Sequence, residues 1–261
     1  MDEAAVLSQV DQLGRATLTL NRPRIHNAFD DELVAQLSTA LGALEADGAV
    51  RVVLLTGAGK NFCAGADLEW MRRMADFSFQ ENLADAGRLA ELFRLLHALK
   101  KPTVAVVRGA AYGGGVGLVS CCDIAVAATG ASFCLSETRL GLIPAVISPY
   151  LVPAIGVRAA QRYCLSAEAF DAAEAHRLGL VHEVSDDPDA LADRISRALL
   201  RCAPGAVAAA KEQVARVAQA DPGRELIRDS VQRIATLRAS AEGKEGLSAF
   251  LAKRPPGWVK E

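Results

Sequence analysis

The sequence predicts an α/β fold in which parallel strands alternate with crossover helices. Short, apolar, β-branched runs recur with one helical pattern between them, as in the crossover units of a parallel sheet. Beyond residue 188 no strand pattern appears, and Ala, Leu, Arg and Glu dominate to about residue 251, a composition that favours helices. We therefore expect a core domain over residues 1–187 and a helical region over residues 188–261.

The first half of the core contains three predicted strands and two predicted helices. Residues 16–20 alternate Thr and Leu and end before Pro23, whose ring cannot continue a strand ladder. Leucines at three- and four-residue spacing then mark an amphipathic helix that Asp30 or Asp31 caps. The other elements are a buried strand at residues 50–56, a long helix at residues 83–99 and a strand at residues 103–107.

The second half of the core contains an unusual glycine-rich segment. Residues 108–142 run from a strand through a glycine cluster and a short apolar segment to two further strands. Gly179 is placed to end a helix, because glycine readily adopts the left-handed conformation of a helix C-terminus. The expected elements are strands at residues 124–128, 132–135 and 180–184 and a helix at residues 171–178.

Charge and composition argue against several classes of protein. The 29 Lys and Arg residues nearly balance the 31 Asp and Glu residues, so no global basic field gathers nucleic acid or anionic lipid. The charge-free stretch at residues 109–122 is shorter than the roughly 20 residues that span a bilayer. The first residues lack the basic start and apolar run of a signal peptide, which predicts a cytoplasmic protein whose six cysteines are thiols.

Two glycine-containing loops, at residues 56–67 and 108–115, each follow a predicted strand. Neither has phosphate-loop spacing, because Lys60 lies only three positions after Gly57 and no Ser or Thr follows it. One interpretation is that the glycines serve tight turns. The other is that each loop leads into a helix whose first N–H groups face one ligand oxygen. The spacing leaves both interpretations open.

Among the carboxylates, Glu137 is the strongest candidate acid or base. It lies between the apolar segments 131–135 and 140–146, and carboxylates are rarely buried without a partner or a purpose. The alternative is an exposed residue at the end of a strand. Asp123 is better explained as a cap or loop anchor. His182-Glu183 does not continue into a zinc-binding HExxH motif, and the cysteines show no CxxC spacing, so no metal site is expected.

Six motifs occur in one order along nearly the whole chain. They are Asn21-Arg22-Pro23, Cys63-Ala64-Gly65-Ala66-Asp67-Leu68, Gly113-Gly114-Gly115, Cys122-Asp123-Ile124, Glu137 before Leu140-Gly141-Leu142-Ile143-Pro144, and Lys253-Arg254-Pro255. This combination resembles the enoyl-CoA hydratase/isomerase family, the crotonases. The resemblance implies a crotonase-like ββα superhelix, a C-terminal helical region used for trimerisation, and a homotrimer or homohexamer. It also implies an acyl-CoA thioester substrate, with no cofactor besides the coenzyme A carried by that substrate.

Carried over by position, the resemblance implies a set of site residues. The backbone N–H groups of Ala66 and Gly114 would form an oxyanion hole for the thioester oxygen, where losing one donor typically costs about 100- to 1000-fold in rate. Glu137 is the implied catalytic residue. The implied coenzyme A contacts are Arg24, Ala64, Asp67 and Leu68, together with Phe250 and Lys253, which would reach a neighbouring subunit's ligand.

The sequence departs from the resemblance at Gly117. Crotonases that hydrate enoyl-CoA usually carry a first glutamate there and a second at the position of Glu137. Three outcomes are open: hydration by Glu137 with a water or a relocated residue, double-bond isomerisation by one shuttling glutamate, or another reaction of the family. Residues 116–123, 133–137 and 144–149 resemble bacterial methylglutaconyl-CoA hydratases, a branch of leucine degradation that also lacks the first glutamate. This favours hydration of methylglutaconyl-CoA or a related branched enoyl-CoA over generic short-chain hydration.

The acyl chain and a second class of function remain open at this level. A distal carboxylate would require a cation or N–H donors, and the candidate cations are Arg72, Arg73 and Arg139. Trp70, Met71 and Met74 either shape an apolar acyl pocket or belong to the core. A eukaryotic relative of these hydratases binds RNA, but the acidic balance and the lack of a basic run argue against a nucleic-acid-binding role here.

Overall fold

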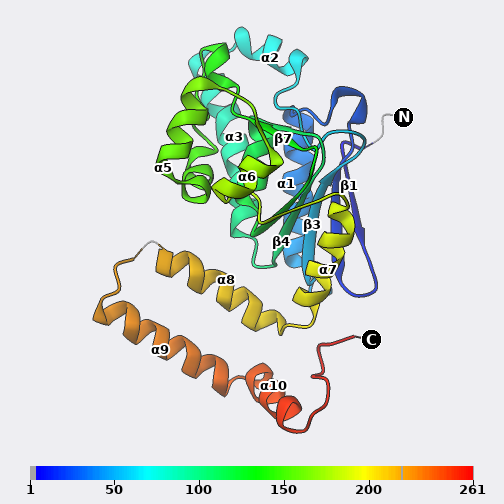
Figure 1. The fold of residues 1–261 in the computed structure, drawn as a ribbon, viewed down its shortest axis with the longest axis vertical. Helices are drawn as coiled ribbons and strands as arrows, with labels where there is room; N and C mark the ends of the chain where they lie inside the picture. The colour runs from blue at the N-terminus through cyan, green and yellow to red at the C-terminus, as the bar shows by residue number, and fades with distance from the viewer. Residues whose placement is uncertain (1–3, 219, 261) are drawn as a thin grey trace.

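A six-stranded sheet forms the centre of the molecule (Figure 1). The structure is a computed structural model that describes residues 4–218 and 220–260. The strand order is β1-β2-β3-β4-β6-β9, and every pair is parallel except the β1–β2 hairpin. The strands are β1 (Val6–Val10), β2 (Arg15–Leu20), β3 (Val52–Gly57), β4 (Thr103–Val107), β6 (Ile124–Ala128) and β9 (Glu183–Ser185).

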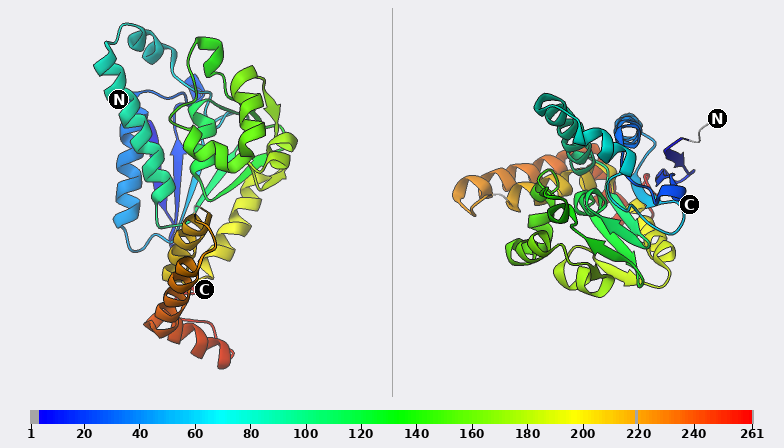
Figure 2. Two further views of the ribbon diagram at one scale, coloured as in Figure 1. Left: turned by 90° about the vertical axis from the view of Figure 1, so that its left-hand side faces the viewer. Right: turned by 90° about the horizontal axis from the view of Figure 1, so that it is seen from above.

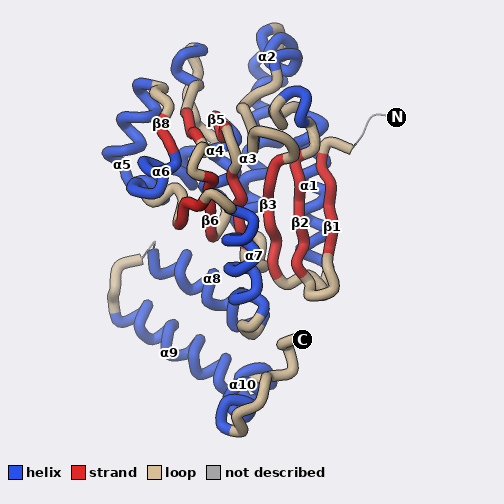
Figure 3. Tube along the Cα trace, turned by 45° about the vertical axis from the view of Figure 1, so that its right-hand side comes forward, coloured by secondary structure: helices blue, strands red, loops and turns tan. Residues whose placement is uncertain are grey.

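A second, three-stranded sheet stands beside the upper end of the first (Figure 3). It contains β5 (Ala110–Tyr112), β7 (Ser132–Cys134) and β8 (Phe170–Asp171), with β5 parallel to β7 and β7 antiparallel to β8. Because β4 continues almost directly into β5, and β6 into β7, the chain passes from the first sheet into the second twice. The loops that follow β5 and β7 therefore lie close to each other.

Helices cover both faces of the large sheet. On one face α1 (Asp31–Ala46) packs with α3 (Phe79–Ala98), and the leucines that predicted α1 are buried in the main core. On the other face α7 (Pro188–Leu200) packs Leu191 and Ala192 against valines of the central strands. Helix α7 therefore packs on the sheet of the core, although its sequence placed it in the helical region over residues 188–261.

The remaining helices of the core are shorter or bent: α2 (Leu68–Ala75), α4 (Gly114–Cys121), α5 (Ser148–Ser166) and α6 (Ala172–Leu178). The sequence patterns did not predict α4 or α5. Three glycines give α4 a poor intrinsic propensity, but most of its residues are buried, so packing stabilises it. Helix α5 contains Pro153 and bends at Gly156, whose φ is +77°, which obscures its periodicity.

A helical extension runs below the sheet (Figure 2, left view). It consists of α8 (Pro204–Ala218), α9 (Arg224–Ala239) and α10 (Ala241–Leu251), which confirms the predicted helical composition. Lys211 of α8 connects the extension to the core through an ion pair of 2.8 Å with Asp123. None of the described helices is long and apolar enough to span a bilayer.

The expected α/β class is confirmed, with local corrections. The six cysteines are free thiols, as expected. Strand β1 escaped prediction because four of its five residues are exposed and it shows no apolar alternation. The strand expected at residues 180–184 is shorter and begins later, at Glu183. The segment 132–135 belongs to the second sheet, not to a single continuous one.

Candidate active site

The loop after β3 runs alongside β5. The N–H of Cys63 donates to the carbonyl of Ala110 at 3.0 Å, and the N–H of Tyr112 donates to the carbonyl of Cys63 at 2.9 Å. These bonds form an isolated parallel bridge between Cys63 and Ala111. The glycine-containing loop at residues 56–67 is therefore fixed against the strand that leads into the second glycine cluster.

Phe29 fixes the far end of this loop. Its N–H donates to the carbonyl of Gly65 and its carbonyl accepts the N–H of Asp67, both at 2.7 Å. Ala66 lies between these two bonds. Within the described part of the chain, the N–H of Ala66 has no acceptor. The backbone donor of Ala66 is thus held rigidly while remaining free to bind a ligand oxygen.

A second free donor lies at the start of α4. Gly113 has φ of +50° and donates its N–H to the carbonyl of Cys134 at 2.8 Å, so the helix begins with Gly114. The N–H of Gly114 has no acceptor among the described residues, as expected for the first turn of a helix. A Cβ on Gly114 would lie 3.0 Å from the Phe29 ring. Phe29 therefore contacts both loops.

Glu137 follows β7 and begins the 3₁₀ turn η2 (Glu137–Leu140). A Cβ built on Gly113 would lie 3.3 Å from Oε1 of Glu137 and 3.9 Å from the Cα of Gly65. The carboxylate is therefore beside Gly113, at the junction of the two loops that carry Ala66 and Gly114. The structure brings these three predicted site residues together.

The environment of Glu137 favours its neutral form. The side chain is half-buried, and its Oε2 is enclosed with no hydrogen-bond partner among the described residues. Burial raises the pKa of the Glu137 carboxyl above its ordinary value, opposed only in part by a hydrogen bond to its own backbone. A carboxyl with a raised pKa accepts and returns protons more readily near neutral pH. This is the property that a proton shuttle requires.

The surroundings of Gly117, three residues after Gly114 in α4, are apolar and filled. A Cβ on Gly117 would lie 2.4 Å from Cγ2 of Ile147 and 2.9 Å from two atoms of the Phe93 ring. Both side chains are almost completely buried. Because real Cβ atoms do not approach so closely, even alanine at this position requires movement of its neighbours. The packing around Gly117 therefore leaves no space for a glutamate side chain at this position.

Two asparagines that sequence analysis missed support the loops. The buried Asn27, with φ of +56°, donates to the carbonyls of Ala58 at 2.9 Å and Asn61 at 2.8 Å, and accepts the N–H of Arg22 at 2.8 Å. Asn61 in turn accepts the N–H of Ala110 at 2.9 Å. No motif or spacing in the sequence distinguishes these asparagines from ordinary turn residues.

The predicted coenzyme A contacts adjoin these loops. Arg24 is exposed in the 3₁₀ turn η1 (Pro23–Ile25), and the N–H of Ala64 donates to the nearby carbonyl of His26 at 3.0 Å. Asp67 caps α2 by accepting the N–H groups of Glu69 and Trp70. The following residue, Leu68, is 69% exposed. Asp67 thus has a structural role whether or not it touches a ligand.

Phe250 and Lys253 lie in the extension, at the opposite end of the molecule from β5 and α4 (Figure 3). Phe250 is 81% exposed. Within one chain these two residues lie far from Glu137. Their contact with the coenzyme A of a neighbouring subunit stays a prediction.

The candidate cations for a distal carboxylate all have partners. Arg72 pairs with Glu69, Arg73 pairs with Asp31, and Arg139 donates to the carbonyl of Ala167. Trp70, in contrast, is buried in the core, and its indole N–H has no acceptor among the described residues.

The remaining polar candidates have structural partners. Asp123 accepts both the N–H and the hydroxyl of Thr103, which confirms its interpretation as an anchor. His182 accepts the N–H of Ala125 at 3.1 Å. Among the residues that the structure describes, no three His, Cys, Asp or Glu side chains gather in a way that could hold a metal ion.

Comparison with known proteins gives consistent results. Residues 12–261 match the sequence model of the enoyl-CoA hydratase/isomerase family. A putative enoyl-CoA hydratase of Thermus thermophilus is 36% identical, over 95% of this chain and 98% of the relative. The 1,2-epoxyphenylacetyl-CoA isomerase of Escherichia coli is 38% identical, over 96% and 97%.

A solved structure agrees as closely. The enoyl-CoA hydratase of Shewanella pealeana superposes with a TM-score of 0.95 at 44% identity, covering 97% of this chain and 96% of that one. Membership of one family explains the two sheets, the glycine loops and the order of the motifs. The chain belongs to the enoyl-CoA hydratase/isomerase family, with its crotonase fold, and is an enzyme of the hydratase type.

Proposed function

We propose that this enzyme adds water across the double bond of an α,β-unsaturated acyl-CoA thioester, with Glu137 as its one catalytic carboxylate. The observation that carries the proposal is the position of that carboxylate, beside Gly113 and next to the two loops whose Ala66 and Gly114 N–H groups have no acceptor among the described residues. Two backbone donors and one carboxylate with a raised pKa are the groups that enolate chemistry next to a thioester requires.

The proposed reaction proceeds through an enolate. Ionised Glu137 removes a proton from water as the water oxygen bonds to the β-carbon. The electrons of the double bond move toward the thioester, and the N–H groups of Ala66 and Gly114 stabilise the charge on its oxygen. Glu137 then delivers the proton to the α-carbon, which restores the ionised carboxylate. One carboxylate suffices because the proton it accepts is the proton it returns.

The packing around Gly117 also supports a second candidate, double-bond isomerisation. Ile147 and Phe93 leave no space for another acid, and a 1,3-shift needs only one base that moves a proton between two carbons. An Escherichia coli relative is named 1,2-epoxyphenylacetyl-CoA isomerase, whose named substrate is an epoxide, so the packing around Gly117 is the observation that favours this candidate. Hydration and isomerisation therefore share the same groups and differ in whether a water molecule is admitted beside Glu137.

For the acyl chain we propose methylglutaconyl-CoA or a related branched enoyl-CoA. The support is the resemblance of residues 116–123, 133–137 and 144–149 to hydratases of that substrate in leucine degradation.

The test compares three thioesters with the purified enzyme: 3-methylglutaconyl-CoA, crotonyl-CoA and a 3-enoyl-CoA. The expected result is a mass gain of one water on the first substrate, with loss of the conjugated-enoyl ultraviolet absorbance. Faster hydration of crotonyl-CoA would contradict the branched-substrate proposal. Migration of the double bond in the 3-enoyl-CoA, with no mass gain on any substrate, would contradict hydration altogether. Glu69→Gln, which changes an exposed carboxylate on α2, is the matched control for Glu137→Gln.

We further propose that the enzyme is a cytoplasmic homotrimer or homohexamer. Helices α8 and α9 expose aliphatic side chains, including Val214, Ile227 and Val231, and exposed apolar patches of this kind favour subunit contacts. Light scattering of the eluting protein measures the assembly, and a monomeric mass would contradict it.

A further inference from the structure

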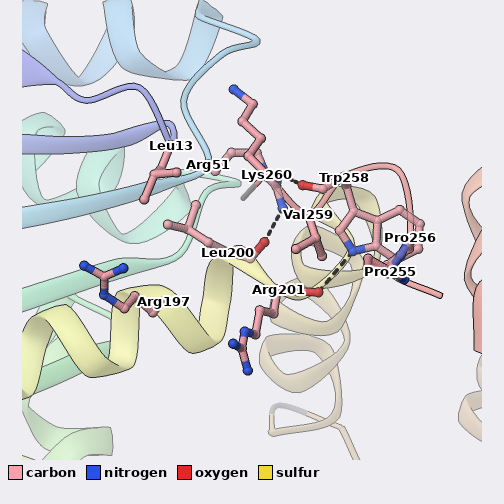
Figure 4. Close-up of a pocket in the computed structure, with 10 residues that line it drawn as sticks. All are labelled: Leu13, Arg51, Arg197, Leu200, Arg201, Pro255, Pro256, Trp258, Val259 and Lys260. Atoms are coloured by element: carbon pink, nitrogen blue, oxygen red, sulfur yellow. Dashed lines mark hydrogen bonds between the residues drawn. The ribbon is translucent and has the colours of Figure 1, made fainter. Parts of the chain in front are cut away.

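A cavity of about 540 Å³ lies between the core and the C-terminal segment (Figure 4). It is far from Glu137, because Arg51 in its wall precedes β3, whereas the loop that carries Ala66 follows the other end of that strand. Among the described residues that line it, four are basic and none is acidic: Arg51, Arg197, Arg201 and Lys260. The cavity is within the size range of small-molecule sites.

Arg51 is held in place without a carboxylate partner. Its guanidinium donates to the carbonyls of Trp258 at 3.1 Å, Leu200 at 3.3 Å and Cys202 at 2.8 Å. Within the described residues it forms no ion pair. Glu242 interacts with Arg51 electrostatically but does not form an ion pair with it. The two Glu242 carboxylate oxygens instead accept the N–H groups of Gly205 and Ala206 at the start of α8. Arg51 is therefore a preorganised and half-buried positive charge.

Of the other three cations in the cavity wall, Arg201 and Lys260 add to the positive charge of Arg51. Arg197 is neutralised by Asp193 at 2.7 Å. Arg201 forms no ion pair among the described residues, and the ammonium of Lys260 contacts only the carbonyl of Gln12, at 3.4 Å, in the described part of the chain. The cavity wall thus carries more positive charge than nearby carboxylates balance.

Trp258 supplies a rigid aromatic wall. Its indole N–H donates to the carbonyl of Arg201 at 3.0 Å, and its ring edge lies against Gly246 of α10, where a Cβ would be 3.0 Å away. The ring is therefore fixed at both ends, and Figure 4 shows it at one side of the cavity, next to Pro255 and Pro256, with the cationic side chains spread around the rest of the wall. A flat apolar group can stack there while an anion contacts the arginines.

We propose that this cavity binds a small phosphate-bearing anion, with the ring portion of the ligand against Trp258. Arginine matches phosphate through two parallel hydrogen bonds and remains charged when partly desolvated. Within one chain the cavity is far from Glu137, so binding there is measured without turnover of an acyl-CoA substrate.

The experiment titrates the full-length enzyme with inorganic pyrophosphate, ADP and succinate. Intrinsic fluorescence reports on two tryptophans, Trp70 and Trp258, and calorimetry gives the dissociation constant. We expect saturable binding of pyrophosphate and ADP, tighter for ADP because of its ring, and weaker binding of succinate. The fluorescence change should disappear in Trp258→Phe, and ADP should remain bound in the presence of saturating coenzyme A.

Charge-removing variants locate the site. Arg201→Gln changes an exposed side chain and should weaken pyrophosphate binding about tenfold, the loss typical of one charged hydrogen bond. Its kcat and KM for the acyl-CoA substrate should be unchanged. Arg158→Gln, on distant α5, is the matched control and should bind as the wild type does.

Three results of the titrations would overturn the proposal, and one result of the coenzyme A competition would do so as well. The titration results are the absence of saturable pyrophosphate and ADP binding, binding that survives unchanged in Arg201→Gln/Lys260→Gln, and succinate binding as tight as that of pyrophosphate. Displacement of ADP by coenzyme A would assign the nucleotide to the acyl-CoA site and would also overturn it.

Discussion

The surroundings of Glu137 and those of Gly117 are built in opposite ways. Glu137 presents a half-buried carboxylate with an unpartnered oxygen, held beside Gly113. Gly117 lies against Ile147 and Phe93, with no space for a side chain. The comparison teaches that Gly117 is fixed by its neighbours, because any side chain there would displace buried atoms of Ile147 and Phe93. In the proposed reaction Glu137 therefore moves every proton without a second carboxylate at this position.

The largest expected effect is at Glu137. Glu137→Gln keeps the shape of the side chain but removes the base, so kcat should fall about 100- to 10,000-fold, the range of general acid–base catalysis. Steady-state kinetics with the preferred enoyl-CoA measures this loss. The control Glu69→Gln should retain wild-type kcat. A folded Glu137→Gln enzyme with full activity would show that another group carries the proton.

The next effect concerns the oxyanion donors. Gly114→Pro removes one N–H at the first position of α4, where proline is tolerated in a helix. Gly114→Ala adds a similar Cβ beside Phe29 but keeps the N–H. We expect kcat/KM of the proline variant to be about 100- to 1000-fold below that of the alanine variant. Equal activities of the two folded variants would exclude Gly114 as a donor.

Stability measurements sharpen the comparison at Gly117. Gly117→Ala forces a Cβ into contact with Ile147 and should lower the free energy of unfolding by about 1–3 kcal/mol, the usual cost of overpacking. Gly117→Glu should be worse, because it also buries a charge, and it should not raise activity.

The control combines two changes. Ile147→Ala should partly rescue the stability of Gly117→Ala, since neighbouring substitutions are coupled. Urea denaturation of the four variants in this cycle measures the coupling. Strictly additive losses would show that Ile147 does not occupy this space.

The smallest effect is in the pH dependence. Because burial raises the pKa of Glu137, the acid limb of kcat/KM should lie above the ordinary carboxyl value. The ionised form is the less stable one in the fold, so the stability contributed by protonated Glu137 is lost as pH rises through its folded-state pKa. The melting temperature of Glu137→Gln relative to wild type should therefore increase with pH across this range. A constant difference would contradict the raised pKa.

Sequence analysis predicted the parts of this site that depend on residue type. Glu137 between two apolar segments indicated a candidate carboxylate. The glycines after two strands left tight turns and exposed backbone donors both open, and only the family resemblance assigned the donors to Ala66 and Gly114. The convergence of these groups was not predictable from spacing, because it depends on the passage of the chain from one sheet into the other. The supports Asn27 and Asn61 were missed for the same reason, since their hydrogen bonds join segments more than 30 residues apart.

The fold was predicted best where burial creates a regular pattern. Helix α1 and strands β3 and β4 present continuous apolar faces to the core. Helix α4 contains three glycines, and tertiary packing rather than propensity stabilises it. Strand β1 lies at the sheet edge with an exposed surface, so no alternation marks it. Local chemistry thus predicts the elements that face the core from within one segment, but not those that depend on distant neighbours.

The most direct test of the one-carboxylate account follows the oxygen of water. The wild-type enzyme and Glu137→Gln are incubated with 3-methylglutaconyl-CoA in water labelled with heavy oxygen, and the thioester product is analysed by mass spectrometry. The account predicts one labelled oxygen on the β-carbon with the wild type, and formation of the same product about 100- to 10,000-fold more slowly with a folded Glu137→Gln enzyme. Labelled product formed by Glu137→Gln at the wild-type rate would contradict it.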